Sequence, residues 1–117
     1  MGHPLGRLKR REDFLRVAAA RKKRVSTGFV LQACPHPDNS TIMRVGFTAS
    51  RKVGGAIERN RTKRRLRAAA AAVLPELGKP GTDYVIIGRR DTATMPFDAL
   101  ESDLRRAVTK VLESKGR

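Results

Sequence analysis

The chain has 117 residues, the size of one ordinary domain covering residues 1–117. Its 26 Lys and Arg against 11 Asp and Glu give a net charge of +15, and its 39% hydrophobic content excludes a wholly disordered basic tail. The longest apolar run, residues 68–74, is too short for a membrane span, and no apolar stretch follows the basic N-terminus as in a secretory signal. A single cysteine cannot form an internal disulfide. These features predict a cytoplasmic globular protein with a polyanionic partner.

The excess charge is concentrated in two segments. Residues 1–24 carry nine Lys or Arg and two acidic residues, while residues 51–67 carry eight Lys or Arg and one Glu. Such blocks attract phosphates, and the release of counterions drives the binding. A membrane surface is disfavoured because the chain has no Trp and alanines follow the second block. We therefore expect a nucleic acid as the partner, and a solvated surface that only maintains solubility is the alternative.

The hydrophobic periodicity predicts three helices and three strands. In chain order we expect a helix at 12–20, a strand at 27–34, a strand at 43–50, a helix at 56–74, a strand at 84–88 and a helix at 97–112. A proline-containing loop is expected at 35–40, and residues 1–6 and 113–117 are expected to be frayed. The order helix, strand, strand, helix, strand, helix predicts an α/β (α+β) two-layer sandwich with a small sheet.

The helix at 56–74 carries two separate stripes. The stripe that we expect to face the core consists of Thr62, Leu66, Ala69 and Val73. The stripe that we expect to face outward consists of Asn60, Lys63, Arg64 and Arg67, with Arg61 and Arg65 widening the basic surface. Arg59 and Lys63 lie nearer the core stripe, so one of them is expected to pack as much as to bind.

Residues 50–67, SRKVGGAIERNRTKRRLR, carry a motif of basic residues around a turn and a helix. The motif consists of the pair Arg51 and Lys52, then Gly54, then Arg59-Asn60-Arg61, then Lys63-Arg64, then Arg67. It resembles the signature of the bacterial ribonuclease P protein subunit. The resemblance spans about residues 7–112 and includes Asp13-Phe14, Phe29-Val30-Leu31, Arg44-Val45-Gly46-Phe47 and Asp83-Tyr84-Val85-Ile86-Ile87.

The resemblance implies a small sandwich with a left-handed β-α-β crossover, against the usual right-handed preference. It also implies that the protein assists a large catalytic RNA that removes the 5′ leader from precursor tRNA. The catalytic RNA and precursor tRNA would be its partners, with no protein partner evident. The residues implied to bind the catalytic RNA are Arg51, Lys52, Arg59, Asn60, Arg61, Lys63, Arg64 and Arg67. Asn60 is equally suited to a local cap or turn bond.

The resemblance further implies a cleft for the single-stranded leader between the first helix and the sheet. Phe14 matches an aromatic position of that cleft, and Ala18 and Gln32 depart from positions that often carry aromatic residues. Gln32, Thr48 and Ser50 share a strand face and offer hydrogen bonds instead. Phe14 as a plain core residue remains the alternative to a stacking platform. The opposite parity of Phe29 and Phe47 assigns these two residues to the core.

A protein-only nuclease would need clustered carboxylates or paired histidines. His3 and His36 are expected to be exposed and inert, Cys34 to be a small core or surface residue, and the aspartates at 38, 83, 91 and 98 form no motif. We therefore expect no catalytic residue in the protein and expect Mg²⁺ to be held mainly by the RNA; metal binding by the protein itself stays open. An architectural or ribosomal-type RNA-binding protein is the alternative function.

Overall fold

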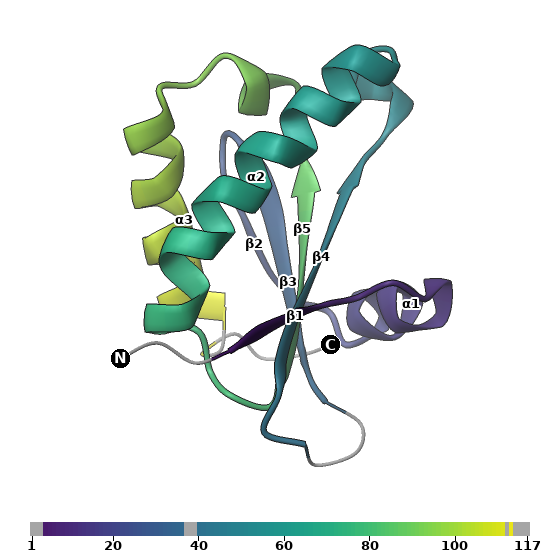
Figure 1. The fold of residues 1–117 in the computed structure, drawn as a ribbon, viewed down its shortest axis with the longest axis vertical. Helices are drawn as coiled ribbons and strands as arrows, with labels where there is room; N and C mark the ends of the chain where they lie inside the picture. Colours follow the sequence, from purple (N-terminus) through teal and green to yellow (C-terminus); the bar gives the residue numbers. More distant parts are fainter. Residues whose placement is uncertain (1–3, 37–39, 112, 114–117) are drawn as a thin grey trace.

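A mixed five-stranded sheet forms the centre of the structure, a computed structural model that describes residues 4–36, 40–111 and 113 (Figure 1). The strands are β1 (Leu5–Arg7), β2 (Lys22–Val25), β3 (Phe29–Pro35), β4 (Met43–Ala49) and β5 (Thr82–Gly88). The helices are α1 (Arg11–Ala19), α2 (Ala56–Leu77) and α3 (Phe97–Val111), with short 3₁₀ helices η1 (Arg51–Val53) and η2 (Arg90–Ala93). All six predicted elements are present in the predicted order, and the α/β class is confirmed. None of the helices within these residue ranges is long and apolar enough to cross a membrane.

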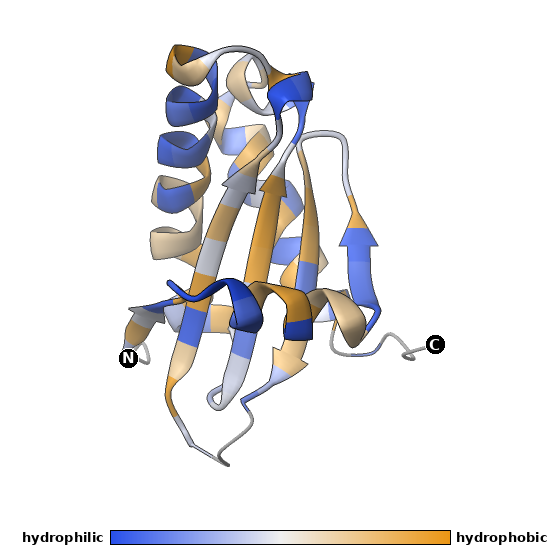
Figure 2. Ribbon diagram, turned by 90° about the vertical axis from the view of Figure 1, so that its right-hand side faces the viewer, coloured by the Kyte–Doolittle hydropathy of each residue, from blue (hydrophilic) through white to orange (hydrophobic). Residues whose placement is uncertain are grey.

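The strands lie in the order β1-β4-β5-β3-β2. β4 is parallel to both β1 and β5, whereas β3 is antiparallel to both β5 and β2. Figure 2 shows α1 in front of the sheet and β4 to the left of β5, with both arrows pointing up. Since α2 joins these strands behind the sheet, the connection is the left-handed crossover that the family resemblance implies.

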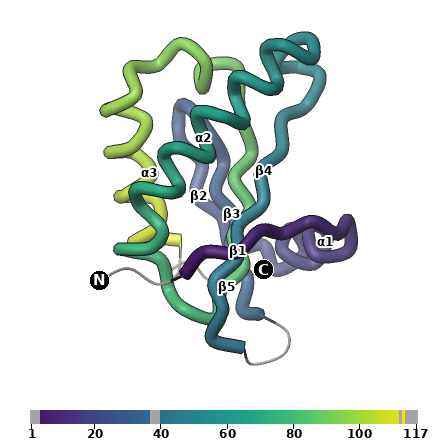
Figure 3. The backbone as a smooth tube through the Cα atoms, viewed as in Figure 1, coloured from purple at the N-terminus to yellow at the C-terminus, as the bar shows by residue number. Residues whose placement is uncertain are grey.

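Helices cover both faces of the sheet. α2 and α3 pack on one face over the main core, which includes Leu66, Tyr84 and Leu104. α1 lies on the opposite face, as Figures 1 and 3 show, over a smaller cluster around Val17 and Val85. The predicted two-layer sandwich is therefore the α2–α3 side of the molecule, and α1 adds a partial layer on the other side.

The sequence patterns did not predict the two edge strands. β1 (LGR) and β2 (KKRV) carry no alternation of apolar and polar residues. Basic residues are a common protection of exposed sheet edges, so edge strands often lack the apolar pattern. Residues 5 and 6 were expected to be frayed, but they pair with β4. The expectations for residues 1–3, 37–39, 112 and 114–117 fall outside the described residues, and with them those for His3 and Asp38.

α2 runs three residues beyond the predicted end, through Pro75. Proline removes one backbone donor, which would bond to the carbonyl of Ala71 four residues earlier. Ala71 is exposed, so water satisfies that carbonyl and the last turn of the helix persists.

Candidate nucleic-acid interface

The outward face of α2 carries the predicted polar stripe. Thr62 and Leu66 are buried against the sheet, and this orientation leaves the opposite side of the helix exposed. The stripe lines a shallow hollow formed by Ile57, Asn60, Lys63, Arg64 and Arg67. The predicted orientation of both stripes is confirmed, while the RNA-binding role of these residues stays a prediction.

Arg7 of β1 extends this face of α2. The guanidinium carbons of Arg7 and Arg67 lie 5.7 Å and 5.8 Å from the centroid of the same Phe47 ring. Cation–π contacts hold both side chains in place and leave their N–H donors available for phosphate oxygens. We call the surface formed by Arg7, Asn60, Arg61, Lys63, Arg64 and Arg67 the α2 basic surface. Arg7 was missed because β1 was not predicted.

Two arginines of the same helix serve the fold instead. Arg59 is half-buried, and its Nη1 donates a hydrogen bond to the carbonyl of Gly54 at 3.0 Å, which fixes the turn before α2. Arg65 donates a hydrogen bond to the carbonyl of Met95 and lies 5.9 Å from the centroid of Phe97. The expectation that Arg65 widens the basic surface is therefore wrong, because Arg65 ties α2 to the segment that begins α3.

A second basic hollow lies where β4 and β5 end. The two strands are parallel, so their carboxyl ends meet at one edge of the sheet, and each is followed by a basic pair. These pairs are Arg51-Lys52 and Arg89-Arg90, all exposed. The hollow, which we call the strand-end hollow, is lined by Thr27, Ser50, Lys52, Val53, Gly88, Arg89, Arg90 and Asp91.

Ser50 belongs to this strand-end hollow. Its hydroxyl accepts a hydrogen bond from the backbone N–H of Lys52 at 3.3 Å and caps η1. The prediction missed Arg89 and Arg90, although a basic pair after each of two strands is visible in the sequence. The signal becomes informative only when β4 and β5 are known to be parallel neighbours.

The sheet face beside α1 contains the other predicted leader-binding residues. Phe14 lies directly on β4, because a side chain at Gly46 would come within 2.5 Å of its ring. The ring is half-buried and packs against the cluster of Leu8, Val17 and Val85. Phe14 thus packs as a core residue on one side and remains partly accessible on the other.

Gln32 and Thr48 lie on the same face as Phe14. Gln32 pairs across the strands with Val85 on one side and Lys23 on the other, and Thr48 pairs with Ile87. Gln32 and Thr48 are both half-buried, which confirms their predicted parity. We call this surface, formed by Phe14, Lys23, Gln32, Thr48 and Ile87, the α1-side face. Ala18 is exposed on α1, so the aromatic ring common at this position in the family is missing.

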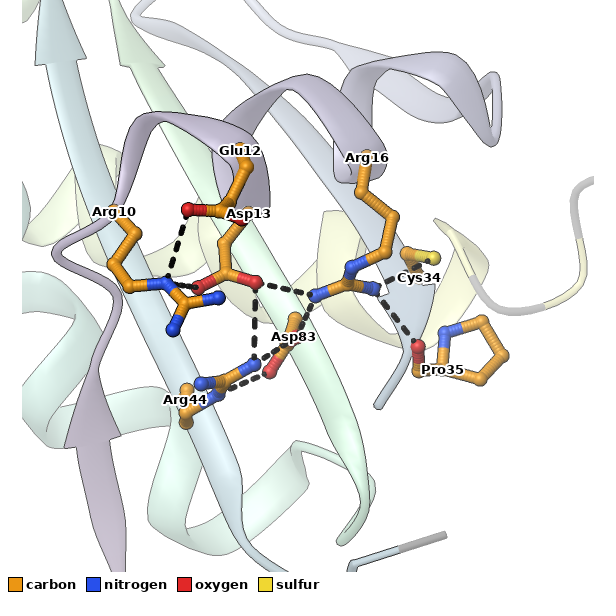
Figure 4. Close-up of polar contacts among 8 residues, drawn as sticks. All are labelled: Arg10, Glu12, Asp13, Arg16, Cys34, Pro35, Arg44 and Asp83. Carbon is orange, nitrogen blue, oxygen red and sulfur yellow. Dashed lines mark hydrogen bonds and ion pairs between the residues drawn. The ribbon is translucent and has the colours of Figure 1, made fainter. Parts of the chain in front are cut away.

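A buried carboxylate fixes α1 to the sheet (Figure 4). Asp83 of β5 has a fully buried side chain, and Arg44 of β4 donates two hydrogen bonds to it, at 2.8 Å and 2.7 Å. Arg16 of α1 forms an ion pair with the same carboxylate. Asp13 of α1 lies 3.4 Å from Arg16 and 3.8 Å from Arg44. Two arginines and two aspartates therefore join α1, β4 and β5 in one network.

The electrostatics of this network favour a charged Asp83. Burial raises the pKa of its carboxyl, but the hydrogen bonds from Arg44 and Arg16 outweigh that effect and hold the pKa below its ordinary value. Burial lowers the pKa of Arg16, and the hydrogen bond to Asp83 outweighs that effect and raises it. Asp83 was not assigned a role from the sequence, because its partners come from distant segments.

The remaining candidate chemical groups stay apart. In residues 4–36, 40–111 and 113, no three His, Cys, Asp or Glu side chains are grouped so that they would hold a metal ion. Cys34 is half-buried and accepts a hydrogen bond from Arg16 at 3.3 Å. His36 is half-buried rather than exposed, and its backbone N–H donates to the carbonyl of Gly81. The geometry therefore offers phosphate-binding surfaces.

Comparison with known proteins agrees with this geometry. Residues 4–112 match the family model of ribonuclease P. The chain is 51% identical to the ribonuclease P protein component of Ruegeria pomeroyi over 89% of this chain and 84% of that protein. It is 47% identical to the corresponding protein of Paramagnetospirillum magneticum, over 95% and 86%. The structure resembles the RNase P protein of Thermotoga maritima with a TM-score of 0.74 and 25% identity, over 89% of this chain and 96% of that one.

We predict that Asp83→Asn lowers the free energy of unfolding at neutral pH by about 3 to 5 kcal/mol, because it leaves two arginines without their buried partner. The folded-state pKa of Asp83 lies below the ordinary value of 3.8. Its contribution is therefore present above about pH 4 and is lost as the pH falls through the folded-state pKa. Urea unfolding at several pH values measures both effects, and the variant should lose stability less steeply in acid.

Glu12→Gln is the matched control, since it removes a carboxylate from an exposed ion pair with Arg10 on the same helix. Exposed pairs contribute about 0 to 1 kcal/mol, so this variant should unfold nearly as the wild type does. Equal losses in the two variants would show that the Asp83 network does not hold α1.

Proposed function

We propose that this chain, which belongs to the ribonuclease P protein family, binds the catalytic RNA through its α2 basic surface and the 5′ leader of precursor tRNA through its α1-side face. Membership makes it a ribonuclease P protein component with a role in tRNA 5′ processing. The observation that carries the proposal is the separation of these two surfaces, which lie on opposite sides of one sheet. Both RNA segments therefore have room to bind at once.

The α2 basic surface suits a folded RNA backbone. Guanidinium groups grip phosphate oxygens in pairs, and a helix sets their spacing. Arg64 and Arg67 are exposed on this surface, and the contact with Phe47 holds Arg67 in place. A side chain that is already held loses less conformational entropy on binding. Asn60 adds a donor and an acceptor for a sugar or a base edge.

The α1-side face suits an unpaired strand. Single-stranded bases present faces for stacking and edges for hydrogen bonds. Phe14 provides one partly exposed ring, Gln32 and Thr48 provide polar groups, and Lys23 beside Gln32 provides a charge. Stacking on an aromatic side chain contributes about 1 to 3 kcal/mol per base, so a face with one such ring depends more on hydrogen bonds and charge.

The strand-end hollow extends this path. Ser50 and Lys52 continue from β4, and Arg89 and Arg90 continue from β5. A leader strand on the α1-side face would reach these cations at the ends of the strands. We therefore add Arg89 and Arg90 to the leader-binding residues.

The chemistry is proposed to belong to the RNA and its Mg²⁺ ions. The protein would neutralise phosphates that would otherwise repel one another when catalytic RNA and substrate meet. This role predicts the largest benefit where cations are scarce. A cytoplasmic location follows as part of the proposal, from precursor tRNA as the substrate. The alternative, an architectural RNA-binding protein, predicts RNA binding without any gain in cleavage.

The test is cleavage of precursor tRNA by the ribonuclease P RNA of the same bacterium, at low Mg²⁺, with and without this protein. We expect a large gain in rate with the protein and no cleavage by the protein alone. Tight RNA binding without a rate gain would favour the architectural alternative. Cleavage by the protein alone would contradict the proposed division of roles.

We predict that Arg64→Ala and Arg67→Ala each weaken binding to the catalytic RNA. Each variant should reduce the slope of log affinity against log salt concentration by about one unit, because one phosphate contact is lost. Titrations of the RNA at several salt concentrations measure this slope. Lys79→Ala removes one exposed cation elsewhere and is the control. An unchanged slope in the α2 variants would remove these residues from the interface.

A further inference from the structure

A third basic hollow lies between β2 and α3, at the edge of the sheet opposite to β1. We call it the β2–α3 groove, and its lining residues are Arg24, Val25, Ser26, Asp103, Arg106, Ala107 and Lys110. Three of these side chains are cationic and one is acidic. The family signature around α2 does not include any of them.

The charge of this groove is only partly balanced within the protein. Asp103 forms an ion pair with Arg106 and accepts a hydrogen bond from the Ser26 hydroxyl at 3.4 Å. Arg24 and Lys110 are exposed, and neither has an ion-pair partner among the described residues. Arg106 and Lys110 are one turn apart on α3, and like charges at this spacing destabilise a helix. A bound phosphate would relieve this repulsion.

The groove adjoins the strand-end hollow. Ser26 lines the groove and Thr27, the next residue, lines the hollow, so only the turn between β2 and β3 separates them. That turn is fixed from both sides, since Arg89 donates a hydrogen bond to the carbonyl of Ser26 at 2.7 Å and Asp103 accepts one from its hydroxyl. The two hollows therefore form neighbouring parts of one basic path in a defined geometry.

We propose that the β2–α3 groove binds the phosphate backbone of the distal part of the 5′ leader, the part that extends beyond the strand-end hollow. This inference rests on the proposed function. The groove is continuous with the leader path, whereas the α2 basic surface lies near the other edge of the sheet. None of its lining residues is aromatic, so it would hold phosphates without regard to base sequence. Val25, with 62% of its surface exposed, offers an apolar contact beside the cations.

The experiment uses the assembled holoenzyme and precursor tRNAs that differ only in leader length. Substrate Kd is measured for the wild type, for Lys110→Ala and for the double variant Arg24→Ala/Lys110→Ala. Both residues are exposed and Arg106 is retained, so Asp103 keeps its partner. Lys79→Ala again removes one exposed charge as the matched control for Lys110→Ala. Binding of each variant to the catalytic RNA alone is measured in parallel.

We expect the wild type to bind more tightly as the leader lengthens, and the groove variants to lose this gain while retaining wild-type affinity for short leaders. Each lost contact with a single strand reduces the salt slope by about 0.7, which corresponds to about fivefold weaker binding at 0.1 M salt. Equal losses at every leader length, or weaker binding to the catalytic RNA, would assign the groove to another RNA and overturn the proposal. Unchanged affinities would show a merely solvated surface and overturn it as well.

Failure of this inference is distinguishable from failure of the proposed function. If the wild-type protein accelerates cleavage of a short-leader substrate but leader length has no effect, only the groove assignment fails. If the wild type does not accelerate cleavage at any leader length, the proposed function itself fails.

Discussion

The buried carboxylate of Asp83 is the contact on which the α1 side of the molecule depends. It lies on β5, receives two hydrogen bonds from Arg44 of the neighbouring β4, and pairs with Arg16 of α1. A buried charge is tolerated only when such partners compensate its loss of hydration. The network therefore fixes where α1 crosses the sheet. Because Phe14 is on α1, the same contacts set the position of its ring relative to Gln32 and Thr48.

The left-handed crossover makes the two sides of the sheet independent. α2 joins β4 to β5 across the face opposite α1, so its basic residues project away from the α1-side face. The carboxyl ends of the same two strands bring Lys52, Arg89 and Arg90 together. One connection thus creates a surface for a folded RNA and the end of a path for a single strand. The protein contributes charge in three places that do not compete for the same phosphate.

The sequence was most informative where a periodic pattern was long. The two stripes of α2 and the face shared by Gln32 and Thr48 follow from helix and strand periods alone. The edge strands β1 and β2 lack such a pattern, and Arg7 was missed with them. The role of Asp83 and the pairing of Lys52 with Arg89 and Arg90 depend on which strands are neighbours. Arg65 was misassigned because a helix period does not show that α3 packs against that flank.

The most direct test of the two-surface account is the difference in affinity between precursor and mature tRNA for a holoenzyme that carries Gln32→Ala and Thr48→Val. A hydrogen bond contributes about 1 kcal/mol, so the loss of two should weaken precursor binding by about tenfold or more. Affinity for mature tRNA and for the catalytic RNA should be unchanged, because neither contacts the α1-side face in this account. Equal weakening of precursor and mature tRNA, or no weakening of either, would contradict it.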